Sequence, residues 1–268
     1  MPMTRIVCHQ LAPVIGELDR NCDTIVASVG AAVGGGADVV VLPELATSGY
    51  VFESMDEARS LAITGDHDVF ARVARELAGS PAVAVFGFCE RGEGGLVHNS
   101  AAVVTADGVQ AVYRKTHLWD TEKHFFTPGS ELPPVLNTAA GRIGVLVCYD
   151  LEFAEMTRHL GVRGADLVAV PTNWPSGPRP DGERPTEVVI AMAAARTNRM
   201  AIACCDRAGT ERGQEWTEGT TIIGHDGWVA ATCDEAGIAC ADLDLAPTRD
   251  KRLSPRNDLF GDRRTDLY

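Results

Sequence analysis

Two segments share one pattern, and this pattern constrains the fold more than any other feature of the chain. Residues 36–43 read Gly-Ala-Asp-Val-Val-Val-Leu-Pro, and residues 164–171 read Gly-Ala-Asp-Leu-Val-Ala-Val-Pro. Each follows a stretch with helical spacing, contains an apolar run of strand length, and ends in a proline that stops the strand. The pattern predicts two central, buried strands. A recurring helix-to-strand connection and an ancient duplication explain the repeat about equally well.

Strand-like and helix-like stretches alternate along the rest of the chain, which is typical of an α/β fold with helices covering sheet faces. We predict strands at 4–11, 37–42, 82–90, 98–105, 109–114, 142–148, 165–170, 200–206, 219–223, 228–233 and 238–243, and helices at 19–33, 54–79, 153–163 and 186–199. Residues 116–132 read as a polar and aromatic loop. No Ser/Gly/Pro linker interrupts the alternation, so we expect residues 1–268 to form a single domain.

Charge and cysteine content limit the partners and the compartment. The formal net charge of −13 argues against nucleic acid, because a phosphate backbone requires a basic surface. No apolar run reaches the roughly 18 residues that a membrane helix needs, and the N-terminus lacks a signal-peptide core. The eight cysteines are irregularly spaced and mostly lie in apolar, strand-like contexts. This usage favours reduced thiols in a cytoplasmic protein over a disulfide framework.

Several common catalytic and binding motifs are absent from the sequence. It has no Gly-x-Ser-x-Gly elbow, no His-Glu-x-x-His, no Walker loop and no Cys-x-x-Cys pair. Gly34–Gly36 read as a helix stop because no helix follows them to cradle a phosphate. Cys204 and Cys205 are neighbours in a predicted strand and would point to opposite faces, so they are not expected to share a metal ion.

Glu44 is the first candidate for chemistry. It follows the wholly apolar strand of the first repeat, in Leu42-Pro43-Glu44. A solvated carboxylate at a strand end is the alternative interpretation. A carboxylate beside a buried strand end, however, would have a raised pKa, which suits a general base.

Lys115 is the second candidate, and here composition helps. The chain has only three lysines (Lys115, Lys123 and Lys251) among its 24 basic residues. A sequence so biased towards arginine has used lysine where it is rare, which favours a specific role for Lys115 over a place on a solvated face. A compact ammonium group can act as a point charge at an oxyanion, whereas a planar guanidinium fits differently.

Cys148 is the third candidate. It closes the predicted strand 142–148, just before a predicted helix. Backbone N–H groups and a helix N-terminus at such a position lower the pKa of a thiol. Taken alone, a buried structural cysteine is the commoner outcome for such a position.

Together these segments resemble a known family. Strand-Pro-Glu at Glu44, Tyr-Arg-Lys-x-His-Leu around Lys115 and Gly-x-x-x-Cys-Tyr-Asp around Cys148 follow the order and intervals of the nitrilase-like (carbon–nitrogen hydrolase) superfamily. Any one motif could arise by chance, but the ordered set is specific. The resemblance covers nearly the whole chain and includes Glu-Lys-His-Phe-Phe-Thr-Pro-Gly at 122–129, Phe-Ala-Glu at 153–155, Pro-Thr-Asn-Trp at 171–174, Glu-Gly at 218–219, Gly-His-Asp-Gly at 224–227 and the charged tail at 250–264.

The resemblance implies a four-layer α-β-β-α sandwich and a Glu-Lys-Cys catalytic set of Glu44, Lys115 and Cys148, without a metal or organic cofactor. Glu122 matches a second glutamate that borders the site in this family; a surface loop carboxylate is the alternative. Many relatives carry Arg-Ala-x-Glu-Asn ahead of the later strands, whereas residues 194–199 here read Ala-Ala-Arg-Thr-Asn-Arg. This departure puts the contacts of that helix in doubt, but not the chemistry.

The implied reaction is hydrolysis of a small carboxamide through a cysteinyl thioester, with the Tyr149 backbone N–H as a second oxyanion donor. We expect Tyr149, Trp119, Asn173 and Trp174 to contact substrate, although Trp119, Trp174, Phe125 and Phe126 suit the core equally well. Tyr-Asp after the cysteine resembles the amidase branches, whereas nitrile-hydrolysing branches typically carry Trp-Glu. Nitrile or N-carbamoyl hydrolysis and a non-catalytic binding module remain the alternatives.

The tail, residues 247–268, is expected to pack or to cross to a partner in a homodimer or larger assembly.

Overall fold

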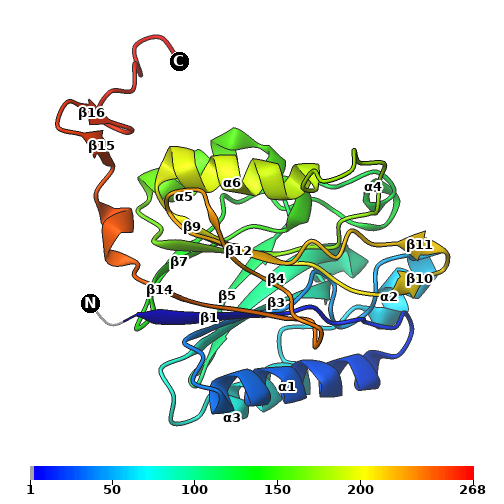
Figure 1. Ribbon diagram of the computed structural model, residues 1–268. Coiled ribbons are helices and arrows are strands. Elements are labelled where there is room, and N and C mark those ends of the chain that lie inside the picture. Colours follow the sequence, from blue (N-terminus) through cyan, green and yellow to red (C-terminus); the bar gives the residue numbers. More distant parts are fainter. Residues whose placement is uncertain (1–2) are drawn as a thin grey trace.

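Two six-stranded sheets form the centre of the fold in the computed structural model, which describes residues 3–268 (Figure 1). The first sheet has the order β14-β1-β2-β3-β4-β5, with bounds Ile238–Leu243, Thr4–His9, Val39–Val41, Val83–Arg91, Val97–Thr105 and Gly108–Arg114. The second has the order β13-β12-β9-β8-β7-β6, with bounds Val229–Thr232, Thr221–Ile223, Ala201–Cys205, Leu167–Pro171, Gly141–Val145 and Val135–Thr138. Two small ribbons pair β10 (Thr210–Glu211) with β11 (Gln214–Glu215) and β15 (Arg252–Ser254) with β16 (Asn257–Asp258).

The two repeated segments form β2 and β8, one inside each sheet. β2 pairs in parallel with β1 and β3, and β8 pairs in parallel with β7 and β9. Successive side chains of a strand point to opposite faces. Val39 and Val41 accordingly pack between the two sheets, whereas Val40 packs with the residues of the outer helices. The prediction that both repeats form central, buried strands is confirmed.

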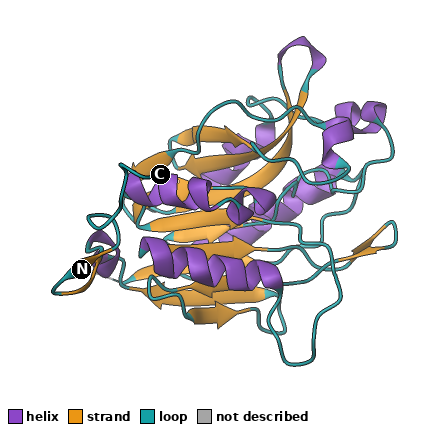
Figure 2. Cartoon of the chain, turned by 90° about the horizontal axis from the view of Figure 1, so that it is seen from above, coloured by secondary structure: helices purple, strands orange, loops and turns teal. Residues whose placement is uncertain are grey.

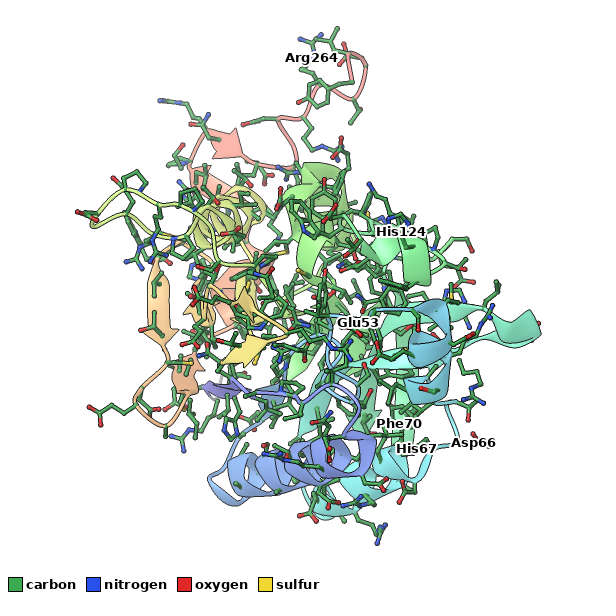
Figure 3. All side chains as sticks on the ribbon, turned by 90° about the vertical axis from the view of Figure 1, so that its right-hand side faces the viewer. Glu53, Asp66, His67, Phe70, His124 and Arg264 are labelled. Atoms are coloured by element: carbon green, nitrogen blue, oxygen red, sulfur yellow. The ribbon has the colours of Figure 1, made fainter. Side chains whose placement is uncertain are left out.

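Helices cover the outer face of each sheet. α1 (Leu18–Gly34) and α3 (Asp68–Glu76) lie on the first sheet, and α5 (Ala154–Val162) and α6 (Thr186–Asn198) lie side by side on the second (Figures 1 and 2). Phe70, labelled in Figure 3, belongs to α3. Its ring packs onto β3, with its centroid 5.7 Å from that of Phe86 and 5.2 Å from that of Phe88. The order of layers is helix, sheet, sheet, helix, so the expected α-β-β-α sandwich is confirmed.

The predicted helix at 54–79 was wrong as one element, because it is two helices. α2 (Met55–Leu61) is capped at its N-terminus by Ser54, whose hydroxyl accepts a hydrogen bond from the N–H of Glu57. The chain then extends, and Ile63 exchanges backbone hydrogen bonds with β3 before α3 begins. Helical spacing alone does not reveal such a break, which depends on pairing with a distant strand.

Three further differences lie in the connections. Strand β7 ends at Val145, so Cys148 does not close a strand but opens the 3-10 turn η2 (Cys148–Glu152). The loop 116–132 contains a short helix, α4 (Glu122–Phe125). The sequence also did not predict β6 or the two ribbons, and two more 3-10 turns are η1 (Glu93–Gly95) and η3 (Ala246–Arg249).

The tail is anchored to the second sheet and to α6 by charged side chains. Asp166, which precedes β8 and has no exposed surface, accepts hydrogen bonds from Arg142, Thr248 and Arg249. Burial opposes the charge of this carboxylate, but the bonds from Arg142 and Arg249 lower the pKa of Asp166 to about 2. Lys251 donates to the carbonyls of Asn198 and Arg199 at the end of α6. The rare lysine Lys251 therefore caps a helix.

No helix within residues 3–268 combines the length and the apolar character needed to cross a membrane. All eight cysteines are free thiols.

Candidate active site

The predicted catalytic side chains meet where strands of both sheets end. Glu44 follows β2 and Lys115 follows β5 in the first sheet, whereas Cys148 follows β7 and Asn173 follows β8 in the second. β2 and β5 run in the same direction, as do β7 and β8, so these residues stand at the carboxyl ends of their strands. In α/β proteins this is the edge where ligands bind.

Glu44 and Lys115 form a buried ion pair, and neither has any exposed surface. The Lys115 Nζ atom lies 2.7 Å from Glu44 Oε1 and 2.7 Å from Glu122 Oε1. Asn99 on β4 donates a further hydrogen bond of 2.7 Å to Glu44 Oε1. One ammonium group therefore links the two carboxylates, and Glu44 Oε1 is already shared by two donors.

Burial sets the charge states of this pair. The pKa of the Glu44 carboxyl is raised to about 7. Burial is the largest cause, the ammonium group of Lys115 opposes it, and the carboxylate of Glu122 adds to it. Burial also lowers the pKa of Lys115, but the carboxylates of Glu122 and Glu44 outweigh it and bring that pKa well above its usual value. Lys115 thus keeps its proton at neutral pH, whereas Glu44 can gain or lose one. The expectation of a raised pKa for Glu44 is confirmed.

Cys148 lies at a sharp turn and is nearly buried. Its φ angle of 45° places the backbone in the left-handed region, which is uncommon for a residue with a side chain and is found at functional sites. The thiol faces the carbonyl oxygen of Asn173, with an Sγ–O distance of 3.9 Å. Only 5% of the residue is exposed, so solvent reaches the thiol poorly.

The expectation that the pKa of the Cys148 thiol is lowered was wrong. Burial raises this pKa well above its usual value, and the carboxylate of Glu44 adds to the effect while Lys115 opposes it. The turn η2 is short and belongs to no long helix, so its N-terminal N–H groups do not outweigh burial. Cys148 therefore carries its proton until a base removes it.

Glu122 is a buried residue and not a surface carboxylate. It begins α4 and is 2% exposed. Besides Lys115, its Oε1 atom accepts a hydrogen bond of 2.6 Å from the Tyr50 hydroxyl, and its Oε2 atom accepts from the Trp119 N–H at 3.2 Å. These bonds fix Glu122 against Lys115, and they make Tyr50 part of the same network.

Sequence reasoning missed Tyr50 and Asn99. Asn99 lies in a strand whose neighbours His98 and Ser100 are also buried and polar. Three consecutive polar residues at the start of an apolar strand were a signal, because buried polar groups need specific partners. Tyr50 lies in a loop after Glu44, and no spacing rule connects it to Glu122.

The four residues expected to contact substrate occupy different environments. Asn173 is buried, and its side-chain amide donates a hydrogen bond of 2.9 Å to the carbonyl of Glu44. Trp174 is buried and donates its backbone N–H to Asp206. Tyr149 is half-buried and meets the 40% exposed Trp119 ring edge to face, with centroids 4.9 Å apart. Tyr149 and Trp119 thus form an aromatic pair beside Cys148.

Two of the four aromatic residues that suited either pocket or core can be placed by their contacts. Phe126 is buried and packs edge to face on Phe52, with centroids 5.7 Å apart. Phe125 is half-buried and lies 6.0 Å from the same ring. Both therefore belong to a small apolar cluster under α4.

Two glycines allow the backbone near Glu44 and Lys115 to approach closely. A Cβ atom added at Gly87 of β3 would lie 2.4 Å from the Leu45 nitrogen and 2.5 Å from the Glu44 Cα atom. A Cβ atom at Gly129 would lie 2.2 Å from the Arg114 carbonyl oxygen. Real Cβ atoms do not approach backbone this closely, so only glycine fits at either position without moving the segments that carry Glu44 and Lys115.

Several buried polar atoms of the site have no hydrogen-bond partner among residues 3–268. They are Glu44 Oε2, Asn99 Oδ1, Thr172 Oγ1 and Asn173 Oδ1. Unpaired polar atoms are costly in an interior and are explained where a ligand pairs with them. Glu44 Oε2 is the free oxygen of a carboxylate whose other oxygen is occupied, so it can accept a proton.

Within residues 3–268, no three His, Cys, Asp or Glu side chains are grouped so as to hold a metal ion.

Comparison with known proteins gives a consistent result. Residues 5–252 match the carbon-nitrogen hydrolase family. The chain is 32% identical to a nitrilase of Pyrococcus abyssi over 99% of both chains, and 32% identical to an (R)-stereoselective amidase of a Pseudomonas species over 76% of this chain and 71% of the other. An amidase from Nesterenkonia sp. superposes with a TM-score of 0.79 at 27% identity, over 99% of this chain and 95% of the other. In one structure of a mutant of that amidase, acrylamide has added to the active site cysteine. The chain therefore belongs to the carbon-nitrogen hydrolase family of the nitrilase superfamily, and it is an enzyme that hydrolyses carbon–nitrogen bonds.

Proposed function

We propose that this enzyme hydrolyses a small carboxamide, with an aliphatic or ω-substituted acyl group, to a carboxylate and ammonia through a thioester on Cys148. The observation that carries the proposal is the hydrogen bonding of the two carboxylate oxygens of Glu44. Its Oε1 atom is held by Lys115 and Asn99, while its Oε2 atom is unpaired. A carboxylate with one fixed and one free oxygen, beside a protonated thiol, is arranged as a general base.

In the first step, Glu44 Oε2 takes the thiol proton as the Cys148 sulfur attacks the amide carbon. A base is necessary because the pKa of the thiol is raised, so the sulfur keeps its proton at neutral pH. Glu44 can serve as this base because its pKa is about 7, so its ionised form is present at neutral pH. The C–S bond forms, and the carbonyl oxygen becomes an oxyanion. Transfer of the proton to a base in the same step avoids a free thiolate in a buried site.

Lys115 stabilises this oxyanion. An ammonium group has three N–H bonds, of which two are directed to Glu44 and Glu122. The third is left for the substrate oxygen, and the backbone N–H of Tyr149 supplies a second donor. Donors fixed before the reaction stabilise charge that develops in the transition state.

The protonated Glu44 then gives its proton to the amide nitrogen, the C–N bond breaks, and ammonia leaves. An acyl thioester remains on Cys148. Glu44 next takes a proton from a water molecule that attacks the thioester carbon. The C–S bond breaks, and the sulfur recovers its proton from Glu44. The reaction consumes one water molecule and returns each residue to its starting state.

The sequence Cys148-Tyr149-Asp150 favours an amide over a nitrile. A planar amide requires one oxyanion site, whereas a linear nitrile gives a thioimidate whose nitrogen must be protonated twice. We expect a higher kcat/KM for an amide than for the nitrile with the same carbon skeleton, measured by ammonia release from purified enzyme. Faster turnover of the nitrile across several skeletons would overturn the amide assignment without affecting the roles of Glu44, Lys115 and Cys148. N-carbamoyl compounds in the same screen test the remaining alternative.

The pKa of Glu44 predicts the pH dependence. Glu44 must be ionised to act as the base, so kcat/KM should rise with pH through an apparent pKa of about 7. The carboxylate of Glu122 raises the pKa of Glu44, so Glu122→Gln should move the midpoint to lower pH even though it lowers the overall rate. A rate profile measured from pH 5 to 9 checks both points. An acid limb near the ordinary glutamate pKa would exclude Glu44 as the titrating group.

We also propose a homodimer or larger assembly. α5, α6 and the tail border an open groove of about 1110 Å³ with a largely apolar lining. Val189 on α6 and the tail residues Leu253, Leu267 and Tyr268 are exposed. Burial of such a surface against a second copy would remove apolar area from water. We expect light scattering at micromolar concentration to give at least twice the monomer mass of 28.5 kDa, and a monomeric mass would refute the proposal.

A further inference from the structure

One buried carboxylate joins the two halves of the site. Asp150, in the turn η2, has no exposed surface. Its Oδ1 atom accepts hydrogen bonds from the backbone N–H of His117 at 3.0 Å and lies 2.8 Å from His117 Nδ1. Its Oδ2 atom accepts from the Tyr113 hydroxyl at 2.9 Å and from the Val147 N–H at 3.3 Å. Both oxygens are therefore occupied, each by two groups.

The positions of these partners matter more than their number. Tyr113 lies two residues before Lys115, and His117 lies two residues after it. Asp150 therefore holds residues 113–117, the Lys115 segment, on both sides of Lys115. Val147 immediately precedes Cys148, and Asp150 itself lies two residues after it. A single carboxylate thus connects the segment that carries the oxyanion donor with the turn that carries the nucleophile.

A second contact strengthens the connection. The His117 ring stacks on the ring of Phe153, which directly follows η2, with centroids 3.6 Å apart. Burial and the carboxylate of Asp150 raise the pKa of Tyr113, so its hydroxyl remains protonated and continues to donate. His117 therefore holds the segment around Lys115 to η2 and its flank by two contacts, one with Asp150 and one with Phe153.

We propose that Asp150 is a positioning residue that sets the distance between Lys115 Nζ and the reacting carbon on Cys148. The inference rests on the proposed function, because it assigns Asp150 a part in the oxyanion step. Lys115 comes from the first sheet and Cys148 from the second, so any movement between the sheets would separate donor and oxyanion. Asn173 provides the corresponding connection for the base, since its amide donates to the Glu44 carbonyl from the second sheet.

Asp150→Asn tests this proposal with little change in size. A carboxamide accepts hydrogen bonds through one oxygen only, so its NH₂ group faces either the His117 N–H or both the Tyr113 hydroxyl and the Val147 N–H. Loss of these bonds should let the Lys115 segment move relative to Cys148. Displacements of about 1 Å can cost about 10²-fold in rate, so we expect kcat to fall by about that factor. KM should change by only a few fold, because the lost interaction acts on the transition state.

Asp166→Asn is the matched control. Asp166 is an equally buried carboxylate that also accepts from several side chains, but it anchors the tail. Both variants should unfold at lower temperature, and only Asp150→Asn should lose kcat. Equal kcat values for folded Asp150→Asn and wild type would overturn the inference, as would an equal loss of kcat in Asp166→Asn.

A milder variant covers the case in which Asp150→Asn does not fold. Tyr113→Phe removes one hydroxyl from the Lys115 side of the connection and leaves the ring in place. We expect kcat to fall about tenfold, as for the loss of one hydrogen bond of about 1.4 kcal/mol. An unchanged kcat in a folded Tyr113→Phe enzyme would then overturn the inference. Two further variants, assayed alongside, show which assignment fails. Full activity in Lys115→Arg contradicts the oxyanion role of Lys115, and full activity in Cys148→Ala contradicts the proposed function itself.

Discussion

Replacing Cys148 with alanine is expected to abolish turnover, with a loss of about 10⁴-fold to 10⁶-fold in kcat. Loss of a nucleophile in a covalent mechanism has an effect of this size, because the remaining groups only bind and polarise the substrate. Ammonia release measures the loss. Intact-protein mass spectrometry after rapid quenching with a slowly hydrolysed amide should show an acyl adduct on Cys148 in the wild type and none in the variant.

The other cysteines supply controls for this experiment. Cys240 is exposed, and Cys22 is buried on α1 in the cluster between the first sheet and its covering helices, so Cys240→Ser and Cys22→Ala should both keep kcat. Cys22→Ala should lose some stability, because it leaves a small cavity. Full activity of Cys148→Ala, or an adduct mapped to another cysteine, would remove Cys148 from the mechanism.

Replacing Lys115 with arginine keeps the positive charge, yet we expect kcat to fall by at least about 10²-fold. The ammonium group has no exposed surface and lies 2.7 Å from each of two carboxylate oxygens. A guanidinium group is larger and flat, so it can pair with Glu44 and Glu122 only by displacing one of them or the substrate oxygen. The loss should appear in kcat more than in KM, since the oxyanion exists only along the reaction path.

Lys123→Arg is the control for this substitution, because Lys123 is exposed on α4, whereas Lys115 has no exposed surface. It should behave as wild type. Circular dichroism should show that Lys115→Arg is folded. A near-normal kcat in that folded variant would mean that the shape of the Lys115 group does not matter, and the oxyanion role would have to be given up.

Much of the fold could be predicted because its central strands, such as β2 and β8, are buried on both faces. Val39, Val40 and Val41 read as a continuous apolar run, and the repeat at 167–170 does the same. Such runs are long enough to recognise and are followed by prolines that mark their ends. Glu44 could then be located from its place after a central strand.

The contacts between distant segments could not be predicted in this way. The pairing of Tyr50 with Glu122 joins residues 72 positions apart, and the pairing of Asn99 with Glu44 joins residues 55 positions apart. Local spacing carries no information about either. The pKa of Cys148 was predicted with the wrong sign for the same reason, because it depends on burial by several elements and on the charge of Glu44.

The division of the site between two sheets has a consequence for how activity returns during refolding. The base, the ammonium group and Glu122 belong to the first half of the sandwich, whereas the nucleophile and Asn173 belong to the second. Each sheet can acquire its strands and its covering helices without bringing Glu44 near Cys148. Catalytic activity therefore reports the docking of the two halves, which makes turnover a more demanding probe of the native state than the recovery of secondary structure.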